Sequence, residues 1–244
     1  MQSLRSMATL ALWFSIFDAG QMTISSRTEA NQQYVVKQKS VFGERRSTES
    51  DVLITADGDR LYGVLVNEVF HLRTPYTSMV LKTRRLAGLT FNTEPLGRTA
   101  IVSILGDRFT GYLSDGPLRF VRDDGIEMQI ERHFVSKVIL AVRPGEDEGF
   151  SLSNRILAGD SDEFHGRVID PRFRMSTRYA TLPVVLDDVR LMRIRGKYGG
   201  RTEIEFVDGK RLSGGLDPMK FDVLLDIGGR ITIDTCAVGL TKLE

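Results

Sequence analysis

Two stretches of this chain are nearly copies of one another. The segment GRTAIVSILGDRFTGYL begins at Gly97, and GRTEIEFVDGKRLSGGL begins at Gly200, 103 residues later. A repeat of this kind has to be recognised before individual motifs are considered, because repeated units pack against each other to build a common core. Repetition therefore constrains the fold more strongly than any other feature of the sequence.

The near-copies belong to a set of four units, each with a glycine in the same apolar setting. The four repeat glycines are Gly63, Gly111, Gly166 and Gly214. Apolar residues follow each of them two, seven and nine positions later. Farther along, the first unit matches the third and the second matches the fourth, always 103 residues apart. The pattern indicates that a block of two units was duplicated as a whole.

This duplication sets the expected domain organisation. We expect block 1 to span residues 51–148 and block 2 to span 149–244, with an acidic, Gly/Pro-containing break at 143–149 between them. The four units are expected at 51–96, 97–148, 149–198 and 199–244. A unit of about 45 residues buries too little apolar surface to be stable alone, so the two units of a block must pack together.

Apolar positions two residues apart predict β-strands, because successive side chains of a strand point to opposite faces. Turn signals such as Asp57-Gly58, Asp124-Gly125 and Asp208-Gly209 separate these runs, and no helical stripe is sustained after residue 50. We therefore expect an all-β fold of four short meander units in two duplicated pairs, with little helix except near the N-terminus. The units are expected to be small barrels or curved sheets in tandem. A four-bladed propeller is the alternative, which the alternation of the units disfavours.

The repeat glycines have a structural interpretation. Glycine inside a strand marks a bulge, a sharp bend or the close approach of another backbone. We interpret the four repeat glycines as the points where a curved strand of each unit folds over its core. A ligand that approaches the backbone there is the less favoured interpretation.

The N-terminal segment carries the one indication of cellular location. Positively charged Met1–Arg5 precedes an apolar run of eleven residues at Met7–Phe17, and small residues follow. This order is typical of a secretory signal, so we expect residues 1–22 to be a signal peptide and the protein to be periplasmic or in the cell envelope. An uncleaved anchor, a buried N-terminal helix, or a start at Met22 are the alternatives, and the alternative location is the cytoplasm. Residues 23–50 are polar and are expected to form a linker or a loosely docked arm.

Charge and cysteine content exclude several kinds of partner. Lys and Arg number 33 against 32 Asp and Glu, a formal net charge of +1, which removes the general electrostatic reason for binding nucleic acid or an anionic membrane. The single cysteine, Cys236, excludes an intramolecular disulfide and a thiolate metal cage. Local basic clusters remain as a candidate interaction surface, with a solvated strand face as the alternative interpretation. These residues are Lys82, Arg84, Arg85, Arg172, Arg174, Arg178, Arg190 and Arg193.

Candidate catalytic groups do not form a recognisable constellation. His71, His133 and His165 occupy non-equivalent places in their units and lack metal-ligand spacing. The pairs Asp123-Asp124 and Asp187-Asp188 lie at predicted turns, where Asp is favoured for local hydrogen bonds. We therefore expect no enzyme activity, no catalytic or metal site and no cofactor.

Two resemblances can be stated on these motifs. The string VDGKRLSGGLDPMKFDVLLD, from Val207, resembles the first half of the Sm/LSm motif, and LMRIRG at Leu191–Gly196 resembles that family's closing signature. This resemblance implies a small Sm/SH3-like barrel and an RNA site with an Asp and a following Asn, of which Asp222 is present and the Asn is missing. The unit GDRLYGVLVNEVFHLRTPYTSMVLKTRRLAGLTF, from Gly58, resembles short β repeats of bacterial envelope proteins. That resemblance covers most of 51–244 and implies tandem β modules.

Together these observations predict a non-enzymatic structural or interaction protein of the bacterial cell envelope, which acts as a tandem β-module scaffold or as an assembly subunit. Its expected partners are another protein, further copies of itself or an anionic envelope polymer. Nucleic acid is not expected, and a membrane contact is expected only through an uncleaved N-terminal segment. The alternative function is an Sm-like tandem in the cytoplasm that binds RNA or another nucleic acid.

Overall fold

The computed structural model describes residues 21–25, 39–91, 97–146, 152–158, 162–195, 201–218, 220–234 and 240–243. Over these ranges the regular structure is almost entirely antiparallel β-sheet, with three single-turn 3₁₀ segments as the only helices. The all-β prediction is confirmed. None of the described helices is long and apolar enough to cross a membrane. The apolar run at 7–17 and Cys236 lie outside the described residues.

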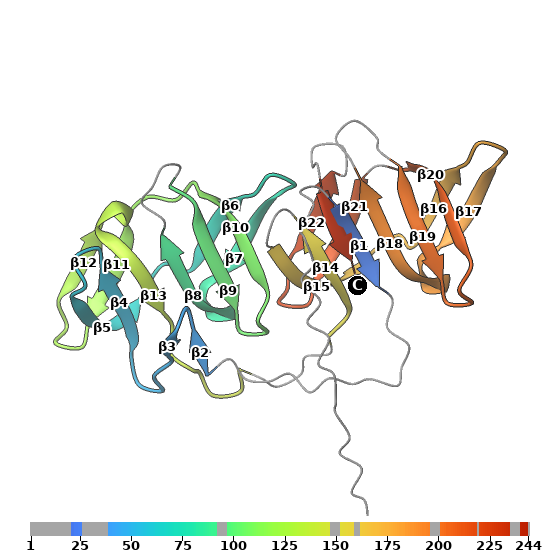
Figure 1. Cartoon of the computed structure of the whole chain (residues 1–244). Coiled ribbons are helices and arrows are strands. Elements are labelled where there is room, and N and C mark those ends of the chain that lie inside the picture. The colour runs from blue at the N-terminus through green and yellow to red at the C-terminus, as the bar shows by residue number, and fades with distance from the viewer. Residues whose placement is uncertain are drawn as a thin grey trace, which may run out of the picture.

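Block 1 is a continuous antiparallel sheet (Figure 1). Its elements are β4 (Asp51–Thr55), β5 (Arg60–Leu65), β6 (Val69–Arg73), β7 (Ser78–Lys82), η1 (Thr83–Arg85), β8 (Leu86–Phe91), β9 (Thr99–Ser103), β10 (Arg108–Leu113), β11 (Leu118–Arg122), β12 (Glu127–Ile130), η2 (Arg132–Phe134) and β13 (Val135–Ile139). Their order across the sheet is β12-β11-β5-β4-β13-β8-β9-β10-β6-β7. The sheet therefore departs from the order of the chain.

The departure is an exchange of strands between the two units. β5 pairs with β11, where Leu65 lies opposite Phe120, and β10 pairs with β6, where Leu113 lies opposite Leu72. The strands of each unit are therefore not all paired with their neighbours in the chain. Alternating apolar residues specify which face of a strand is buried, and a partner strand from the sister unit satisfies that pattern equally well.

The repeat glycines lie directly against the partner strand from the sister unit. A methyl group on Gly63 would overlap the backbone carbonyl oxygen of Val121 in β11, and one on Gly111 would overlap a carbonyl oxygen of β6. The remaining two repeat glycines are also close to the strand that crosses them. None of the four has a positive φ. Glycine is therefore required there by lack of space for a side chain, and not by backbone conformation.

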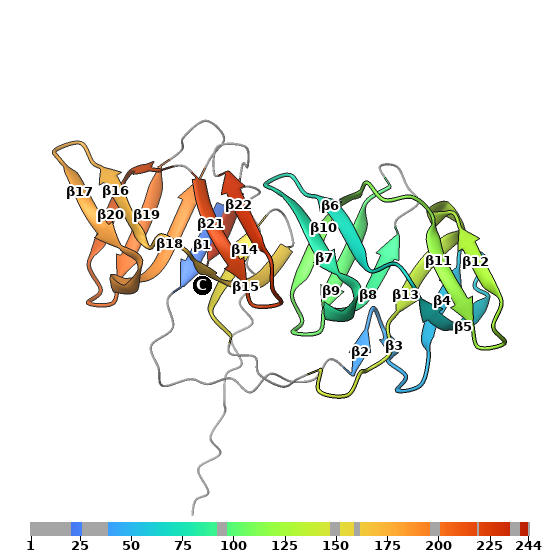
Figure 2. The same ribbon diagram turned by 180° about the vertical axis from the view of Figure 1, so that it is seen from behind.

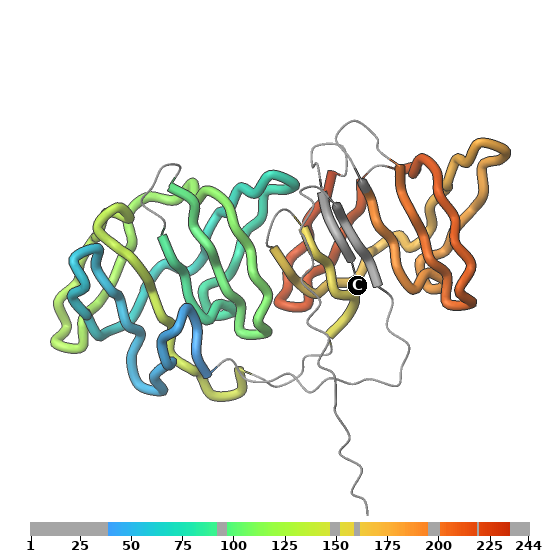
Figure 3. The backbone as a smooth tube through the Cα atoms, in the orientation of Figure 1, coloured from blue at the N-terminus to red at the C-terminus, as the bar shows by residue number. Residues whose placement is uncertain are grey.

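Block 2 repeats these pairings 103 residues later (Figure 3). Its elements are β14 (Asn154–Ala158), β15 (Asp162–Val168), β16 (Arg172–Ser176), β17 (Thr181–Val185), η3 (Leu186–Asp188), β18 (Val189–Arg195), β19 (Thr202–Phe206), β20 (Arg211–Asp217), β21 (Lys220–Leu225), β22 (Arg230–Asp234) and β23 (Leu240–Leu243). Val168 lies opposite Val223, as Leu65 lies opposite Phe120 in block 1. The same exchange of strands thus occurs in both blocks.

One strand of block 2 comes from the other end of the chain. In block 1, β13 lies between β4 and β8, with Val138 opposite both Leu53 and Leu89. The corresponding place between β14 and β18 is taken by β1 (Gln21–Ser25), with Ile24 opposite Ile156. The two residues opposite Val138 of β13, Leu53 and Leu89, are 36 positions apart in the sequence. The residues of β14 and β18 that pair with β1 are offset by the same 36 positions. β1 is therefore the structural equivalent of β13, and β23 pairs alongside it.

The described residues of the polar region at 23–50 include regular structure. Besides β1, it contains a hairpin of β2 (Ser40–Val41) and β3 (Glu44–Arg45). Val41 is buried in a small apolar cluster with residues of β4, β8 and β13. In the described part of this region, a few apolar residues and one buried arginine, Arg46, anchor a segment whose overall composition is polar.

Candidate interaction site

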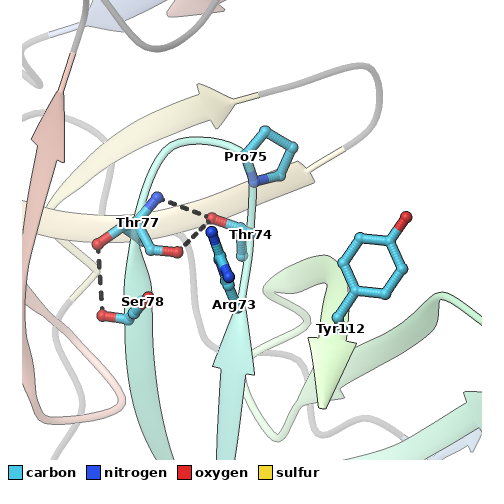
Figure 4. Close-up of a pocket in the computed structure, with 6 residues that line it drawn as sticks. All are labelled: Arg73, Thr74, Pro75, Thr77, Ser78 and Tyr112. Carbon is cyan, nitrogen blue, oxygen red and sulfur yellow. Dashed lines mark hydrogen bonds between the residues drawn. The ribbon is translucent and has the colours of Figure 1, made fainter. Parts of the chain in front are cut away.

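A surface cavity of about 540 Å³ lies on the exposed face of β6, β7 and β10 (Figure 4). Its lining residues are Arg73, Thr74, Pro75, Thr77, Ser78 and Tyr112. A second cavity of about 440 Å³ shares three of these residues and continues along the same strands past His71 and Val80. The two cavities together form one groove, called here the β6–β10 groove.

Strand register brings the central residues of the groove together. Arg73 on β6 lies opposite Tyr112 on β10 and, on its other side, opposite Ser78 on β7. Tyr112 is 42% exposed, and within the described residues no ion pair or side-chain hydrogen bond holds the Arg73 guanidinium. A guanidinium beside an aromatic ring can bind a carboxylate through paired hydrogen bonds while the ring contacts apolar groups.

His71 marks the other end of the groove. Its ring Nδ1 lies 2.7 Å from Oδ1 of Asp115, and its backbone N–H donates to Oδ2 of the same carboxylate over 2.6 Å. Asp115 follows β10, so this pair exists only because β10 and β6 are neighbours. The contact with Asp115 could not be predicted from the sequence, because it depends on the pairing of β10 with β6.

The turn between β6 and β7 closes the groove. The Thr74 hydroxyl accepts from the Thr77 N–H and donates to the Thr77 carbonyl oxygen, each over 3.0 Å. The Thr74 N–H also donates to the Thr77 carbonyl oxygen. This compact turn leaves Tyr76 pointing away from the groove and into block 2.

Tyr76 is part of a buried junction between the blocks. It is 2% exposed, and its hydroxyl donates to Oδ2 of Asp162 over 2.7 Å. Its ring lies beside that of Phe164, which also stacks on Phe109 with ring centroids 5.3 Å apart. β10 and β15 pair at Arg108 and Glu163, so the buried core runs from one block into the other. The groove is therefore supported from behind by the second block.

A second polar contact completes the junction. Asp107 has a fully buried side chain, and its Oδ1 accepts from the His165 N–H over 3.0 Å and lies 2.8 Å from the ring Nδ1. Its Oδ2 accepts from the Ser103 hydroxyl. Asp107 and Asp162 are equivalent residues of adjacent units, each four positions before its repeat glycine. The junction thus brings together the start of β10 in block 1 and the equivalent start of β15 in block 2.

Burial governs the ionisation of Asp162. Loss of solvent raises the pKa of this carboxyl, and the Tyr76 hydroxyl and the Arg108 charge offset only part of that effect. The Asp162 carboxyl therefore binds its proton more tightly in the folded protein than in the unfolded chain. The associated stability is fully present below the ordinary pKa of about 3.8 and is lost as the pH rises through the raised value.

Replacing Asp162 with asparagine should remove this pH dependence. The amide oxygen can still accept from Tyr76, so the melting temperature should rise at pH 7 by roughly 2–4 °C, the usual effect of about 1 kcal/mol in a chain of this size, and should not rise at pH 3. Thermal melts between pH 3 and pH 8 measure the difference. Asp124→Asn, at an exposed turn, should show no such gain, and an Asp162→Asn protein that is less stable than the wild type at pH 7 would contradict the interpretation.

The predicted basic residues are distributed over separate surfaces. Lys82, Arg84 and Arg85 belong to β7 and η1 of block 1, whereas the other five lie in block 2. Arg172 and Arg174 are exposed together on β16, with Arg178 in the following turn. The structure does not bring the eight residues into one patch, and their role stays a prediction.

Arg190 and Arg193 lie on β18, and the neighbouring strand β19 carries the acidic residues Glu203 and Glu205. Arg190 is 3.4 Å from a Glu205 oxygen, and Glu205 also pairs with Arg211 over 3.0 Å. Arg193 lines a cavity of about 390 Å³ over β18, β19 and β20 together with these acidic and basic neighbours. Such a mixed surface fits self-complementary contacts better than a purely anionic partner.

Asp222, which the Sm resemblance would place in an RNA site, is occupied within the chain. Its carboxylate accepts from the Arg230 guanidinium over 2.6 Å and from the Thr232 hydroxyl. The Thr232 hydrogen bond and then the Arg230 hydrogen bond lower the pKa of Asp222. These contacts use the oxygens that a nucleotide base would need.

Comparison with protein-family models, with curated proteins and with solved structures finds no match for this chain. In the ranges that the structure describes, no three His, Cys, Asp or Glu side chains gather as a metal site would require.

Proposed function

We propose that this protein is a non-enzymatic interaction protein of the bacterial cell envelope, which acts as a tandem β-module scaffold or assembly subunit. In this proposal the four units form small Sm/SH3-like barrels in two duplicated pairs, and the N-terminal segment directs export. The observation that carries the proposal is the β6–β10 groove, an open surface in which Tyr112 lies opposite an arginine, Arg73, whose guanidinium has no ion pair among the residues that the structure describes.

The chemistry of the groove indicates the kind of partner. Arg73 offers paired donors to a carboxylate, and Tyr112 and Val80, 42% and 52% exposed, offer apolar area next to it. A protein segment with an acidic side chain beside an apolar one would satisfy both. Tyrosine and arginine are also the residue types that contribute most to binding energy at protein interfaces.

The test is photo-crosslinking in the native organism. A benzoyl-phenylalanine in place of Tyr112 should capture a discrete partner, and Arg73→Glu should abolish the capture by repelling the acidic segment. The matched control is the same photoreactive residue in place of Val64, which occupies the equivalent position on β5 and is 48% exposed. Equal capture at both positions, or capture that persists after the charge reversal, would rule out the groove as the binding site.

The nucleic-acid alternative is tested on the purified protein. If the chain binds oligonucleotides with an affinity that falls steeply with salt, an Sm-like role replaces the proposed one.

A further inference from the structure

Two turns with the same sequence pattern differ completely in burial. The turn between β16 and β17 carries Thr177 and Tyr179, 103 residues after Thr74 and Tyr76. The Thr177 hydroxyl accepts from the Ala180 N–H over 3.0 Å and donates to the Ala180 carbonyl oxygen over 2.8 Å, as Thr74 does with Thr77. Yet Tyr76 is 2% exposed and Tyr179 is 89% exposed.

The difference comes from what lies next to each turn. Tyr76 inserts between the blocks, where Asp162 accepts its hydroxyl and Phe164 covers its ring. Tyr179 belongs to the β16–β17 turn, which lies at the end of block 2 that is farthest from block 1 (Figures 1 and 2). Tyr179 is therefore held in the same kind of turn as Tyr76 but lacks the contacts that bury Tyr76.

The missing counterpart is present at the opposite end of the molecule. Asp59 and Leu61, at the start of β5, are the block 1 equivalents of Asp162 and Phe164. Asp59 is exposed, and Leu61 is half-buried at the edge of the core. β5 lies at the end of block 1 that is farthest from block 2, as both views show (Figures 1 and 2).

From this arrangement we infer that a second copy of the chain docks head to tail. Tyr179 of one copy takes the place of Tyr76, and the Asp59 carboxylate and Leu61 side chain of the next copy take the places of Asp162 and Phe164. This inference rests on the proposed function as an assembly subunit and names its partner. Because the docking repeats the internal junction, each further copy can add in the same way, and the assembly is open-ended.

One other pair of positions at this contact is complementary. Leu212 is the equivalent of Phe109 and Leu61 is the equivalent of Phe164, so the two leucines meet where two phenylalanine rings meet in the internal junction.

One position makes the contact weaker than the internal junction. The pair Arg108 and Glu163 is replaced by Arg211 and Arg60. Each arginine already has a carboxylate of its own chain, Glu205 for Arg211 and Glu44 for Arg60, both over 3.0 Å. The repulsion is therefore reduced, and association between copies is reversible and dependent on concentration.

The experiment is complementation between two surface variants of the full chain, followed by sedimentation velocity over a concentration series. The wild type should form a ladder of oligomers. Tyr179→Ala should weaken association at least about 30-fold, as removal of an interface hot-spot residue does, and Asp59→Lys should do the same. Each variant alone should be monomeric, and an equimolar mixture should form a heterodimer and nothing larger, because only one intact pair of surfaces remains.

The outcomes separate this inference from the proposed function. Tyr112→Ala is the matched control, since it removes an exposed tyrosine from the groove and should leave the oligomer ladder unchanged. A wild type that stays monomeric, or a mixture that forms no heterodimer although both variants melt like the wild type, overturns head-to-tail docking. If head-to-tail docking fails but a partner is still captured at Tyr112, the proposed function stands and only the docking inference is rejected.

Discussion

Replacing Gly214 with alanine should lower the free energy of unfolding by about 3 kcal/mol or more, whereas the same change at the neighbouring Gly215 should alter it by less than about 1 kcal/mol. A methyl group on Gly214 would overlap the backbone carbonyl oxygen of Ser176 in β16. A backbone atom cannot move aside as a side-chain end can, so β20 and β16 would have to separate. A methyl group on Gly215 would meet nothing within 4 Å.

Urea unfolding of the two variants measures this difference within one strand. Gly166→Ala provides an intermediate case, because the nearest atom to its added methyl is a side-chain carbon, Val223 Cγ1, at 2.6 Å. Its cost should lie between those of the other two. Equal stability of the Gly214→Ala and Gly215→Ala proteins would show that β16 does not approach Gly214 as closely as described.

Removing Glu146 should destabilise the protein by about 3–5 kcal/mol, since the buried Arg46 guanidinium would lose a carboxylate that accepts two of its hydrogen bonds. Arg46 is 4% exposed, and its Nη2 donates to Oε2 of Glu146 over 2.9 Å. The same guanidinium also donates to the carbonyl oxygens of Leu140 and Ala141, over 2.8 and 2.9 Å. These bonds fasten the segment before β4 to the end of β13.

The size of this effect depends on burial, and an exposed pair provides the control. Arg122 and Asp124 lie 2.7 Å apart with both side chains exposed, so Asp124→Ala should cost less than about 1 kcal/mol. Replacing both buried partners, as Arg46→Met with Glu146→Leu, should recover most of the loss from Glu146→Ala. Chemical unfolding measures all three, and similar costs for Glu146→Ala and Asp124→Ala would mean that the pair is solvated.

The β-strands and their buried faces could be predicted because that information is local. Phe70 and Leu72, seven and nine residues after Gly63, are both fully or almost fully buried, as the alternation requires. The partner of each strand could not be predicted in the same way. Leu65 would be equally buried against a strand of its own unit or against Phe120 of the sister unit. Only the close approach of β11 to Gly63 distinguishes the two arrangements.

The site was harder to predict because its residues depend on the exchange. Arg73 and Tyr112 lie in different units and become neighbours only when β10 pairs with β6. Tyr76 and Tyr179 share one sequence pattern and have opposite environments, so the sequence pattern alone cannot say which of them is exposed. The basic residues are clustered in the sequence, but local charge density carries no information about strand pairing.

The placement of β1 has a consequence for how the chain is made and folded. During synthesis, the strand that completes block 2 leaves the ribosome before any of block 1, and its neighbours β14 and β18 follow only after block 1 is finished. Block 1 has all of its strands within 51–139 and can fold as it emerges. Block 2 then closes around a strand already made, a contact of large sequence separation that is expected to form last. A label attached at the N-terminal strand would therefore report on the maturation of the half of the molecule that is synthesised last.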